Sequence, residues 1–160
     1  MAEKLRRGLQ NLLDGCESRT RLQVMISKNL AGCIITNSGG QVLLIHRNTA
    51  RLVQWELPGG KQEPGEELED TAAREAFEEV GLEVFGLRNV GGTTFEHNDI
   101  LWHYAWFKPS ELQGNAIVKE TKSFDKLAYF DLISSGLAKQ KLSPNVLAII
   151  EKLKSGQLKL

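Results

Sequence analysis

Apolar and polar residues alternate in several short stretches of this chain, and this spacing predicts β-strands. The first two lie near residues 30–36 and 42–47, and the run Asn37-Ser38-Gly39-Gly40 between them predicts a hairpin turn. Further strands are expected near residues 83–87, 90–95, 100–107 and 127–130. Helices are expected near residues 132–137 and 145–153, the second of them after Pro144.

The strongest helical pattern covers residues 68–80. Small or apolar residues recur three and four positions apart and predict its buried face: Ala72, Ala73, Ala76, Phe77 and Val80. Three carboxylates, Glu75, Glu78 and Glu79, share the other side of the helix. Pro64-Gly65 predicts a turn before the helix, and Gly81 is the residue expected just past its end. The preceding run of residues 56–60, Glu-Leu-Pro-Gly-Gly, is expected to break any regular element.

Hairpins mixed with helices that cannot all cover one face predict an α/β fold, with a mixed β-sheet between helical layers. The 160 residues and their 41% hydrophobic content suit one compact domain, which we place at residues 30–160. Residues 1–29 are expected to form an N-terminal helical extension. Its apolar stripe contains Leu5, Leu9, Leu12 and Leu13.

The 20 basic and 20 acidic side chains cancel, which argues against nucleic acid or membranes as partners. Charge is unevenly distributed, since residues 56–83 carry ten acidic and two basic side chains. Cys16 and Cys33 have no metal-ligand or CxxC spacing and are expected to be reduced thiols. The N-terminus has no apolar signal segment, so we expect a soluble, cytoplasmic protein.

Three carboxylates on one helical arc repel one another, and the repulsion grows when they are removed from water. A hard divalent cation relieves this repulsion. Carboxylate oxygens suit Mg²⁺, with Mn²⁺ able to replace it, and Mg²⁺ is commonly shared between one or two carboxylates and a substrate phosphate. The acidic helix therefore predicts phosphate chemistry.

The same stretch resembles the Nudix box, a pattern of glycines, glutamates and an Arg-Glu pair at fixed spacing. The chain fills every position of that pattern, with Gly60, Glu66, Arg74, Glu75, Ala76, Glu78, Glu79, Gly81 and Leu82. The residues leading into the box, Gln41 to Arg47 and Trp55 to Gly60, are also similar to the family. The resemblance covers about residues 30–131 and implies a Nudix-type αβα sandwich with a mixed β-sheet between helices.

The resemblance also implies roles for the box residues. Glu78 and Glu79 are expected to be the principal metal ligands, Glu75 a further ligand or the general base, and the Gly60 carbonyl an additional ligand. Arg74 is expected to orient a carboxylate. For Glu66 two roles stay open, either bonding backbone N–H groups at the helix start or joining the metal ligands.

In many family members the general base lies outside the box, where this chain has Glu120 in a lysine-rich loop. Glu96 and Asp99 compete with Glu120 for this role. Arg47 is a candidate for substrate phosphate, and Trp55, Phe95 and Tyr104 are candidates for a nucleobase pocket. Each of these four could instead be structural, and Tyr104 alternates with Trp102 and Trp106 in a way that also suits a sheet core.

The expected activity is metal-dependent hydrolysis of the pyrophosphate linkage in a nucleoside diphosphate joined to another moiety. Features typical of the ADP-ribose, dinucleoside polyphosphate and coenzyme A branches of the family are absent from the sequence. A nucleoside triphosphate, cleaved to a monophosphate and pyrophosphate, is therefore the leading substrate. The alternatives are an ADP-ribose or nucleotide-sugar pyrophosphatase and a non-catalytic nucleotide-sensing module. A homodimer is left open.

Overall fold

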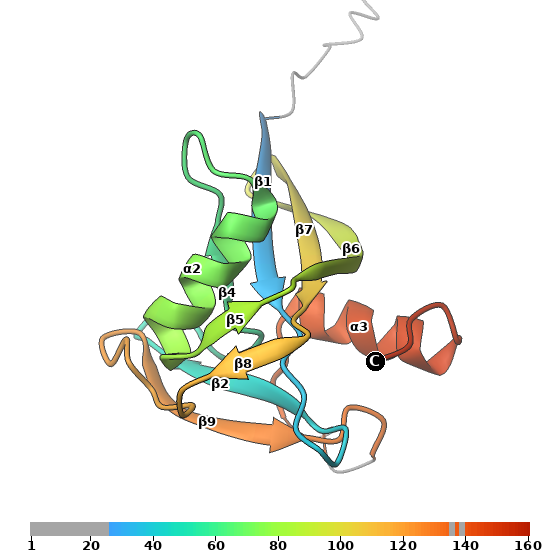
Figure 1. Cartoon of the computed structure of the whole chain (residues 1–160). Helices are drawn as coiled ribbons and strands as arrows, with labels where there is room; N and C mark the ends of the chain where they lie inside the picture. Colours follow the sequence, from blue (N-terminus) through green and yellow to red (C-terminus); the bar gives the residue numbers. More distant parts are fainter. Residues whose placement is uncertain (1–25, 135–136, 138–139) are drawn as a thin grey trace, which may run out of the picture.

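The computed structural model describes residues 26–134, 137 and 140–160. The predicted N-terminal helix and Cys16 lie outside the described residues. In chain order the elements are β1 (Ile26–Cys33), β2 (Val42–Asn48), β3 (Val53–Glu56), β4 (Gly59–Lys61), α2 (Leu68–Val80), β5 (Glu83–Phe85), β6 (Arg88–His97), β7 (Ile100–Lys108), β8 (Glu111–Gln113), β9 (Phe124–Phe130) and α3 (Pro144–Lys154) (Figure 1). Strand β1 crosses the boundary that we predicted between residues 29 and 30.

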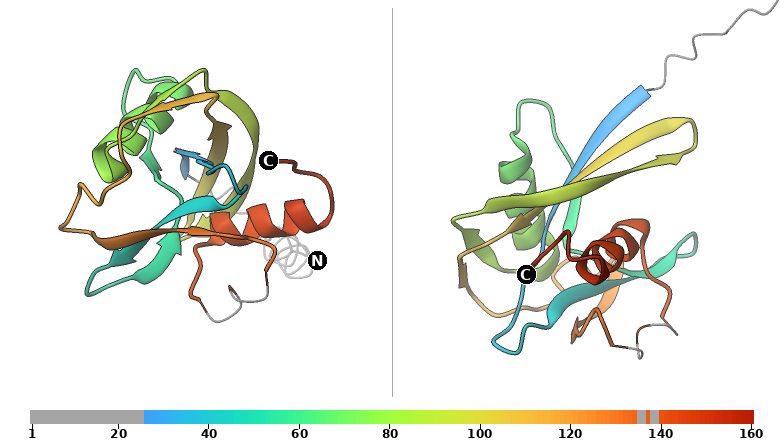
Figure 2. Two further views of the ribbon diagram at one scale, coloured as in Figure 1. Left: turned by 60° about the horizontal axis from the view of Figure 1, so that its bottom comes forward. Right: turned by 90° about the vertical axis from the view of Figure 1, so that its right-hand side faces the viewer.

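Four strands form a mixed sheet in the order β4-β1-β7-β6. Strands β1 and β7 are parallel, whereas β4 and β6 pair antiparallel with their neighbours. A second sheet has the order β3-β2-β9, and β5 pairs with β8. Helices α2 and α3 lie on opposite sides of the strands (Figure 2), so the predicted α/β fold with a mixed sheet between helices is confirmed.

Several local expectations were wrong. Residues 36 and 42 form only an isolated bridge, and the strands around them enter different sheets, so the predicted hairpin is reduced to its turn. Residues 59–61 form β4 despite the Pro-Gly-Gly run, because β1 provides an antiparallel partner. Leu132 to Ser134 form a turn where a helix was expected.

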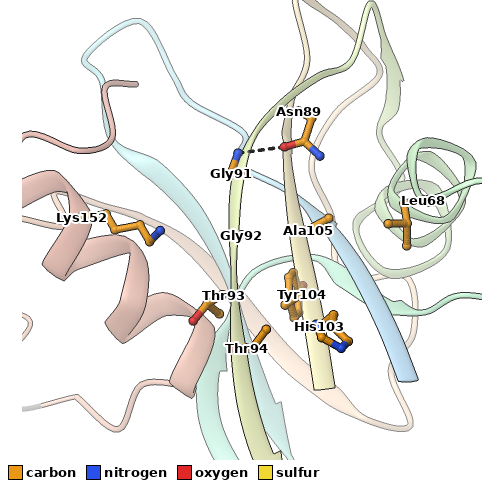
Figure 3. A pocket seen from close by; sticks show the side chains of 10 residues that line it. All are labelled: Leu68, Asn89, Gly91, Gly92, Thr93, Thr94, His103, Tyr104, Ala105 and Lys152. Carbon is orange, nitrogen blue, oxygen red and sulfur yellow. Dashed lines mark hydrogen bonds between the residues drawn. The ribbon is translucent and has the colours of Figure 1, made fainter. Parts of the chain in front are cut away.

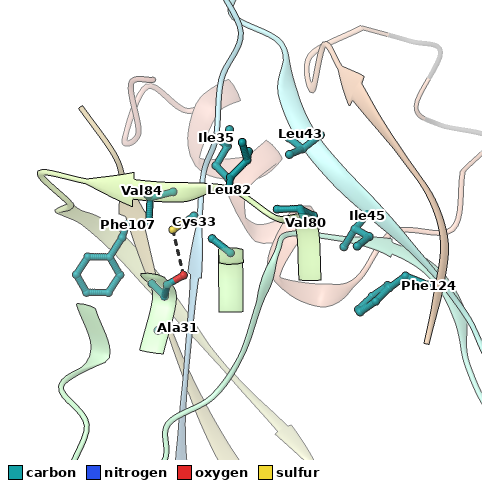
Figure 4. Close-up of a cluster of buried hydrophobic side chains, with 12 residues drawn as sticks. Ala31, Cys33, Ile35, Leu43, Ile45, Val80, Leu82, Val84, Phe107 and Phe124 are labelled. Carbon is teal, nitrogen blue, oxygen red and sulfur yellow. Dashed lines mark hydrogen bonds between the residues drawn. The ribbon is translucent and has the colours of Figure 1, made fainter. Parts of the chain in front are cut away.

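Alternation along the strands divides the core into two layers. In β1 and the residues after it, Ala31 and Cys33 point toward α2, whereas Ile34 packs with the residues of α3. The layer beneath α2 includes Val80, Leu43 and Phe107 (Figure 4). Burial of these side chains fixes α2 against the sheet and therefore sets which of its carboxylates face inward.

Helix α2 has the predicted bounds, and Gly81 follows it in the left-handed conformation at φ 71°. Ala72, Ala76 and Val80 are fully buried, as predicted. Phe77 is instead 44% exposed, with the Lys119 ammonium 3.4 Å from its ring centroid. The buried face is thus rotated away from Phe77 and toward Glu79, which is only 2% exposed. Within the described residues, no helix has the length and apolar character needed to cross a membrane.

Candidate active site

A cavity of about 850 Å³ opens between the start of β4, the inner face of α2 and the loops beside α3. Five carboxylates line it: Glu56, Glu75, Glu79, Glu96 and Glu120. Two arginines, Arg47 and Arg51, and the glycines Gly59 and Gly60 also line it. The cavity therefore brings the C-terminal half of the acidic helix together with residues from three other parts of the chain.

Glu79 is the most buried carboxylate of this cavity wall. Its Oε2 accepts a hydrogen bond from the Gly59 N–H at 2.9 Å, so the carboxylate is anchored to β4. Burial raises the pKa of Glu79 to about 9, and the nearby Glu75 carboxylate adds to the shift. The sequence placed Glu79 on the outward arc, but the buried face of α2 is rotated away from Phe77 and toward Glu79, so Glu79 faces inward.

Glu75 packs directly against Gly60. A Cβ atom built on Gly60 would collide with the Glu75 carboxylate, so any other residue at this position would displace that carboxylate. Burial also raises the pKa of Glu75, although Arg74 opposes the shift. The Gly60 backbone and the partly desolvated carboxylates of Glu75 and Glu79 therefore line the same cavity.

Arg74 organises the outer carboxylates. Its Nε donates to Glu66 Oε1 at 2.6 Å, and its Nη1 donates to Glu75 at 2.9 Å and to Glu78 at 3.2 Å. Its Nη2 donates to the Lys61 carbonyl at 3.1 Å. The planar guanidinium thus connects the start of the helix, its middle and β4.

Glu66 lies in the loop before α2 and does not line the cavity. Its Oε2 accepts hydrogen bonds from the Glu63 N–H at 3.0 Å and from the Thr71 hydroxyl at 2.8 Å. The hydrogen bond from Arg74 lowers the pKa of Glu66 to about 2. These contacts anchor the loop before α2, and both roles left open for Glu66 stay predictions.

The donor set suits a hard cation, because carboxylates and a backbone carbonyl supply only oxygen. In the part of the chain that the structure describes, no three acidic, histidine or cysteine side chains are already arranged as a metal centre. Two ligand candidates are engaged elsewhere, since Glu79 bonds to Gly59 and Glu78, with its side chain 56% exposed, pairs with Arg74. A cation bound here would therefore compete with these contacts for Glu78 and Glu79.

Glu120 reaches the cavity because its loop is fastened to the end of α2. The N–H groups of Ile117 and Lys119 donate to the carbonyls of Val80 and Glu79 at 3.0 and 2.9 Å. The Glu120 carboxylate also accepts a hydrogen bond from the Ser123 hydroxyl at 2.6 Å. Among the competing acids, Glu96 lines the cavity and Asp99 does not.

Three of the four substrate-binding candidates line the cavity: Arg47, Phe95 and Tyr104. Arg47 is held by Glu56, to which its Nε and Nη2 donate at 2.9 and 2.7 Å. Trp55 does not line the cavity. Its ring packs edge-to-face against Phe130, and its Nε1 donates to Gln140 Oε1 at 3.1 Å. These contacts are structural.

The sequence did not single out several polar residues of this wall, namely Arg51, Gln54, Glu56, Ser143 and Asn145. Gln54 donates to Glu56 at 2.8 Å, so Glu56 is a buried acceptor for two neighbours. Asn145 is buried at the start of α3, where Pro144 predicted the helix but nothing indicated that Asn145 lines the cavity. These residues meet at the cavity wall because strands that are far apart in the sequence pair with one another.

A second cavity, of about 530 Å³, lies around the edge strand β6. Figure 3 shows β6 passing between Leu68 and Lys152, with Asn89 accepting the Gly91 N–H. None of the described residues that line it is acidic. The chemistry predicted from the sequence therefore belongs to the larger cavity.

Comparison with known proteins agrees with this geometry. The NUDIX domain model matches residues 28–151. Over 53 residues, or 33% of this chain, the sequence is 42% identical to "Nucleoside diphosphate-linked moiety X motif 6" of Mus musculus and covers 17% of that protein. It is 46% identical over 48 residues, 30% of this chain, to "Putative 8-oxo-dGTP diphosphatase" of Bacillus subtilis, of which it covers 31%. The chain thus spans at most about a third of these relatives.

Solved structures share the fold at low sequence identity. A MutT protein from Methanosarcina mazei aligns with a TM-score of 0.72 and 21% identity, covering 85% of this chain and 99% of that one. The E. coli ORF135 protein aligns with a TM-score of 0.70 and 22% identity, covering 85% and 94%. Both similarities establish the arrangement of helices and sheets.

Proposed function

The chain belongs to the NUDIX domain family, and on that premise we propose that it is a metal-dependent pyrophosphohydrolase acting on a nucleoside diphosphate joined to another moiety. The observation that carries the proposal is the meeting of Glu75, Glu79 and the Gly60 backbone in one cavity with Arg47. Desolvated carboxylates and a fixed guanidinium in the same cleft suit a polyphosphate held through a cation.

Mg²⁺, for which Mn²⁺ can substitute, would supply charge neutralisation of the phosphates and a bound water of lowered pKa. Glu75, Glu78, Glu79 and the Gly60 carbonyl are the ligands we assign to it. At neutral pH without a cation, the pKa of about 9 keeps a proton on Glu79, so binding of a cation would release that proton.

Arg47 would hold a substrate phosphate, since its Nε and Nη2 are already fixed by Glu56. Arg74 would orient Glu75, to which it donates through Nη1. Glu120 is our choice for the general base because its loop is anchored to the end of α2 and its carboxylate lines the cavity. Glu75 and Glu96 line the same cavity and are the alternatives.

We propose a nucleoside triphosphate as substrate, with a nucleoside monophosphate and pyrophosphate as products. Phe95 and Tyr104 supply apolar surface for a base, and Asn145 and Ser143 supply polar groups at the same wall. The Bacillus subtilis relative, a putative 8-oxo-dGTP diphosphatase by its name, supports including oxidised purine nucleotides. ADP-ribose and nucleotide sugars remain the competing substrates, and the homodimer and cytoplasmic location stay predictions.

The test is a panel of nucleoside triphosphates, 8-oxo-dGTP, ADP-ribose and nucleotide sugars, incubated with the purified chain and Mg²⁺ or Mn²⁺. Products are separated by chromatography and pyrophosphate is assayed directly. We expect a triphosphate to give monophosphate and pyrophosphate, with no turnover in EDTA. The Glu79→Gln variant controls for contaminating phosphatases. Turnover of ADP-ribose or a sugar alone would replace the substrate assignment, and no turnover of any compound would favour the sensing module.

A further inference from the structure

An exposed aromatic side chain of α2 has a charged partner on a distant loop. Phe77 is 44% exposed, and the Lys119 ammonium lies 3.4 Å from the centroid of its ring. This distance is well within the range of a cation–π interaction. Phe77 lies between Ala76 and Glu78 of the Nudix box but is not itself a position of that pattern. Neither core packing nor metal binding therefore accounts for this contact.

Lys119 belongs to the segment between β8 and β9, which passes the C-terminal end of α2 (Figure 1). The Lys119 N–H donates to the Glu79 carbonyl at 2.9 Å, two residues after Ile117 donates to Val80 at 3.0 Å. The last carbonyls of a helix have no donor within the helix, so the segment satisfies two of them. Helix α2 has no basic residue in its last turn. The Lys119 ammonium therefore supplies the positive charge that stabilises a helix C-terminus.

The side chains of this segment alternate between two sides. Ala116 and Val118 pack against the core layer beneath α2. Ile117 and Lys119 are exposed. This alternation is that of an extended chain, in which consecutive side chains point to opposite sides. Holding Lys119 on the outer side therefore directs Glu120 inward, and the Glu120 carboxylate lines the cavity.

The charge of Glu120 acts on the other acids of the cavity. Burial is the main cause of the raised pKa of Glu75, and the charges of Glu78 and Glu120 add to the shift. The carboxylate of Glu120 also accepts a hydrogen bond from the Ser123 hydroxyl, three residues further along its own loop. The connection to α2 runs through Lys119, which immediately precedes Glu120 and contacts the helix through both its N–H and its ammonium.

We propose that Phe77 and Lys119 are positioning residues for the general base, because the Lys119 ammonium, held on the Phe77 ring, keeps the Glu120 carboxylate in the cavity. The inference rests on the proposed function and deepens it, since an exposed contact on the outer side of α2 then places the group to which we assign the base role. Neither Phe77 nor Lys119 lines the cavity, so both act through Glu120 and not on the substrate.

The first experiment compares wild type with Phe77→Leu, Lys119→Met and the double variant, using the best substrate of the panel in Mg²⁺. Leucine and methionine retain apolar bulk but remove the aromatic face and the charge. A cation–π contact at an exposed site shifts an equilibrium by about twofold to fivefold, so we expect each variant to lower kcat by about that factor. KM should change less than about twofold, because neither side chain contacts the substrate. The double variant should lose no more than either single variant, since both remove the same contact.

The same substitutions made in Glu120→Gln test whether the contact acts through the base. In that background Phe77→Leu and Lys119→Met should lower kcat no further, because the carboxylate that they place is already absent. Phe77→Tyr and Lys119→Arg retain the ring and the charge and should keep the wild-type kcat. An equal loss in both backgrounds would overturn the inference, since the contact would then support α2 and not Glu120.

Two substitutions serve as matched controls. Lys122→Met removes an exposed lysine of the same loop, and Phe85→Leu removes a ring that is 43% exposed on β5. Within the described residues, neither side chain takes part in a cation–π contact. Both variants should keep the wild-type kcat and KM, and losses equal to that of Phe77→Leu would overturn the inference.

Hydrogen exchange of the full chain, measured without nucleotide, separates this inference from the proposed function. The Lys119 N–H, bonded to the Glu79 carbonyl, should exchange about twofold to fivefold faster in Phe77→Leu and at the wild-type rate in Phe85→Leu. Faster exchange in a chain that hydrolyses no nucleotide would support the contact and contradict the proposed function. Unchanged exchange, or an unchanged kcat in an active Phe77→Leu enzyme, would overturn the inference and leave the hydrolase assignment intact.

Discussion

The Glu79 carboxylate and the Gly59 N–H are joined by a 2.9 Å hydrogen bond that ties the acidic helix to the first residue of β4. The two residues are twenty positions apart in the chain. Gly60 follows Gly59 directly and packs against Glu75. The hydrogen bond to Gly59 therefore holds the backbone of residues 59–60 between the carboxylates of Glu79 and Glu75. The bond therefore sets the spacing of the groups to which we assign catalysis.

We predict that Glu79→Gln lowers kcat more than about tenfold, because even partners of metal ligands cost 10- to 100-fold when removed. Glutamine retains an acceptor for the Gly59 N–H, so the fold should persist. Circular dichroism and steady-state kinetics with Mg²⁺ check both points. Glu69→Gln, an exposed carboxylate in the first turn of the same helix, is the matched control. Full activity of Glu79→Gln would refute its assignment as a ligand.

The metal-free chain should also lose stability as the pH rises from about 4.5 to about 9. Burial raises the pKa of Glu79 from 4.5 to about 9, so the folded state binds a proton that the unfolded state has released. Across that interval the free energy of unfolding must fall. Thermal melts in EDTA should show a shallower fall for Glu79→Gln, and parallel profiles for the two proteins would contradict the burial of an ionisable group.

Gly60→Ala should remove most activity while leaving the chain folded. The new Cβ collides with the Glu75 carboxylate, and the backbone at Gly60 is not in the left-handed region, so the side chain yields first. A displacement of about 1 Å at a catalytic group can cost 100-fold in rate. Gly39→Ala is the control, because its Cβ would meet only Asn37 Oδ1 at 3.4 Å. The measurement is kcat together with the melting temperature, and a fully active Gly60→Ala would show that Glu75 need not stay where it lies.

Glu120→Gln should lower kcat by a factor of about 100 or more and remove the acidic limb of the pH–rate profile, as expected for a lost general base. Glu111→Gln, an exposed acid on β8, controls for the change in net charge. If the profile of Glu120→Gln keeps its shape, Glu75 or Glu96 takes the base role, and the corresponding variants then distinguish those two.

The sequence predicted best what local spacing decides. The bounds of α2 and its end at Gly81 follow from a helical period closed by a glycine, and the structure confirms both. Prediction from the sequence failed where strands that are far apart in the chain pair with one another. Strand β4 forms because β1 pairs with it. Glu79 faces inward, where it is bonded to the Gly59 N–H of β4. Glu56 and Asn145 join the cavity only through the assembled sheets, so no local pattern could indicate them.

Glu66→Gln should destabilise the protein at neutral pH and much less in acid. Its carboxylate accepts hydrogen bonds from Arg74, the Glu63 N–H and the Thr71 hydroxyl, and these bonds, with Arg74 the largest contributor, lower its pKa from 4.5 to about 2. A carboxylate with a lowered pKa contributes stability that is present above 4.5 and is lost as the pH falls toward about 2. The gap in melting temperature between wild type and Glu66→Gln should therefore be largest above pH 4.5 and narrow below it. Glu67→Gln is the neighbouring control, because the Glu67 side chain makes no capping hydrogen bond. A gap that stays constant down to pH 2 would mean that Glu66 supports the loop through packing and not through its charge.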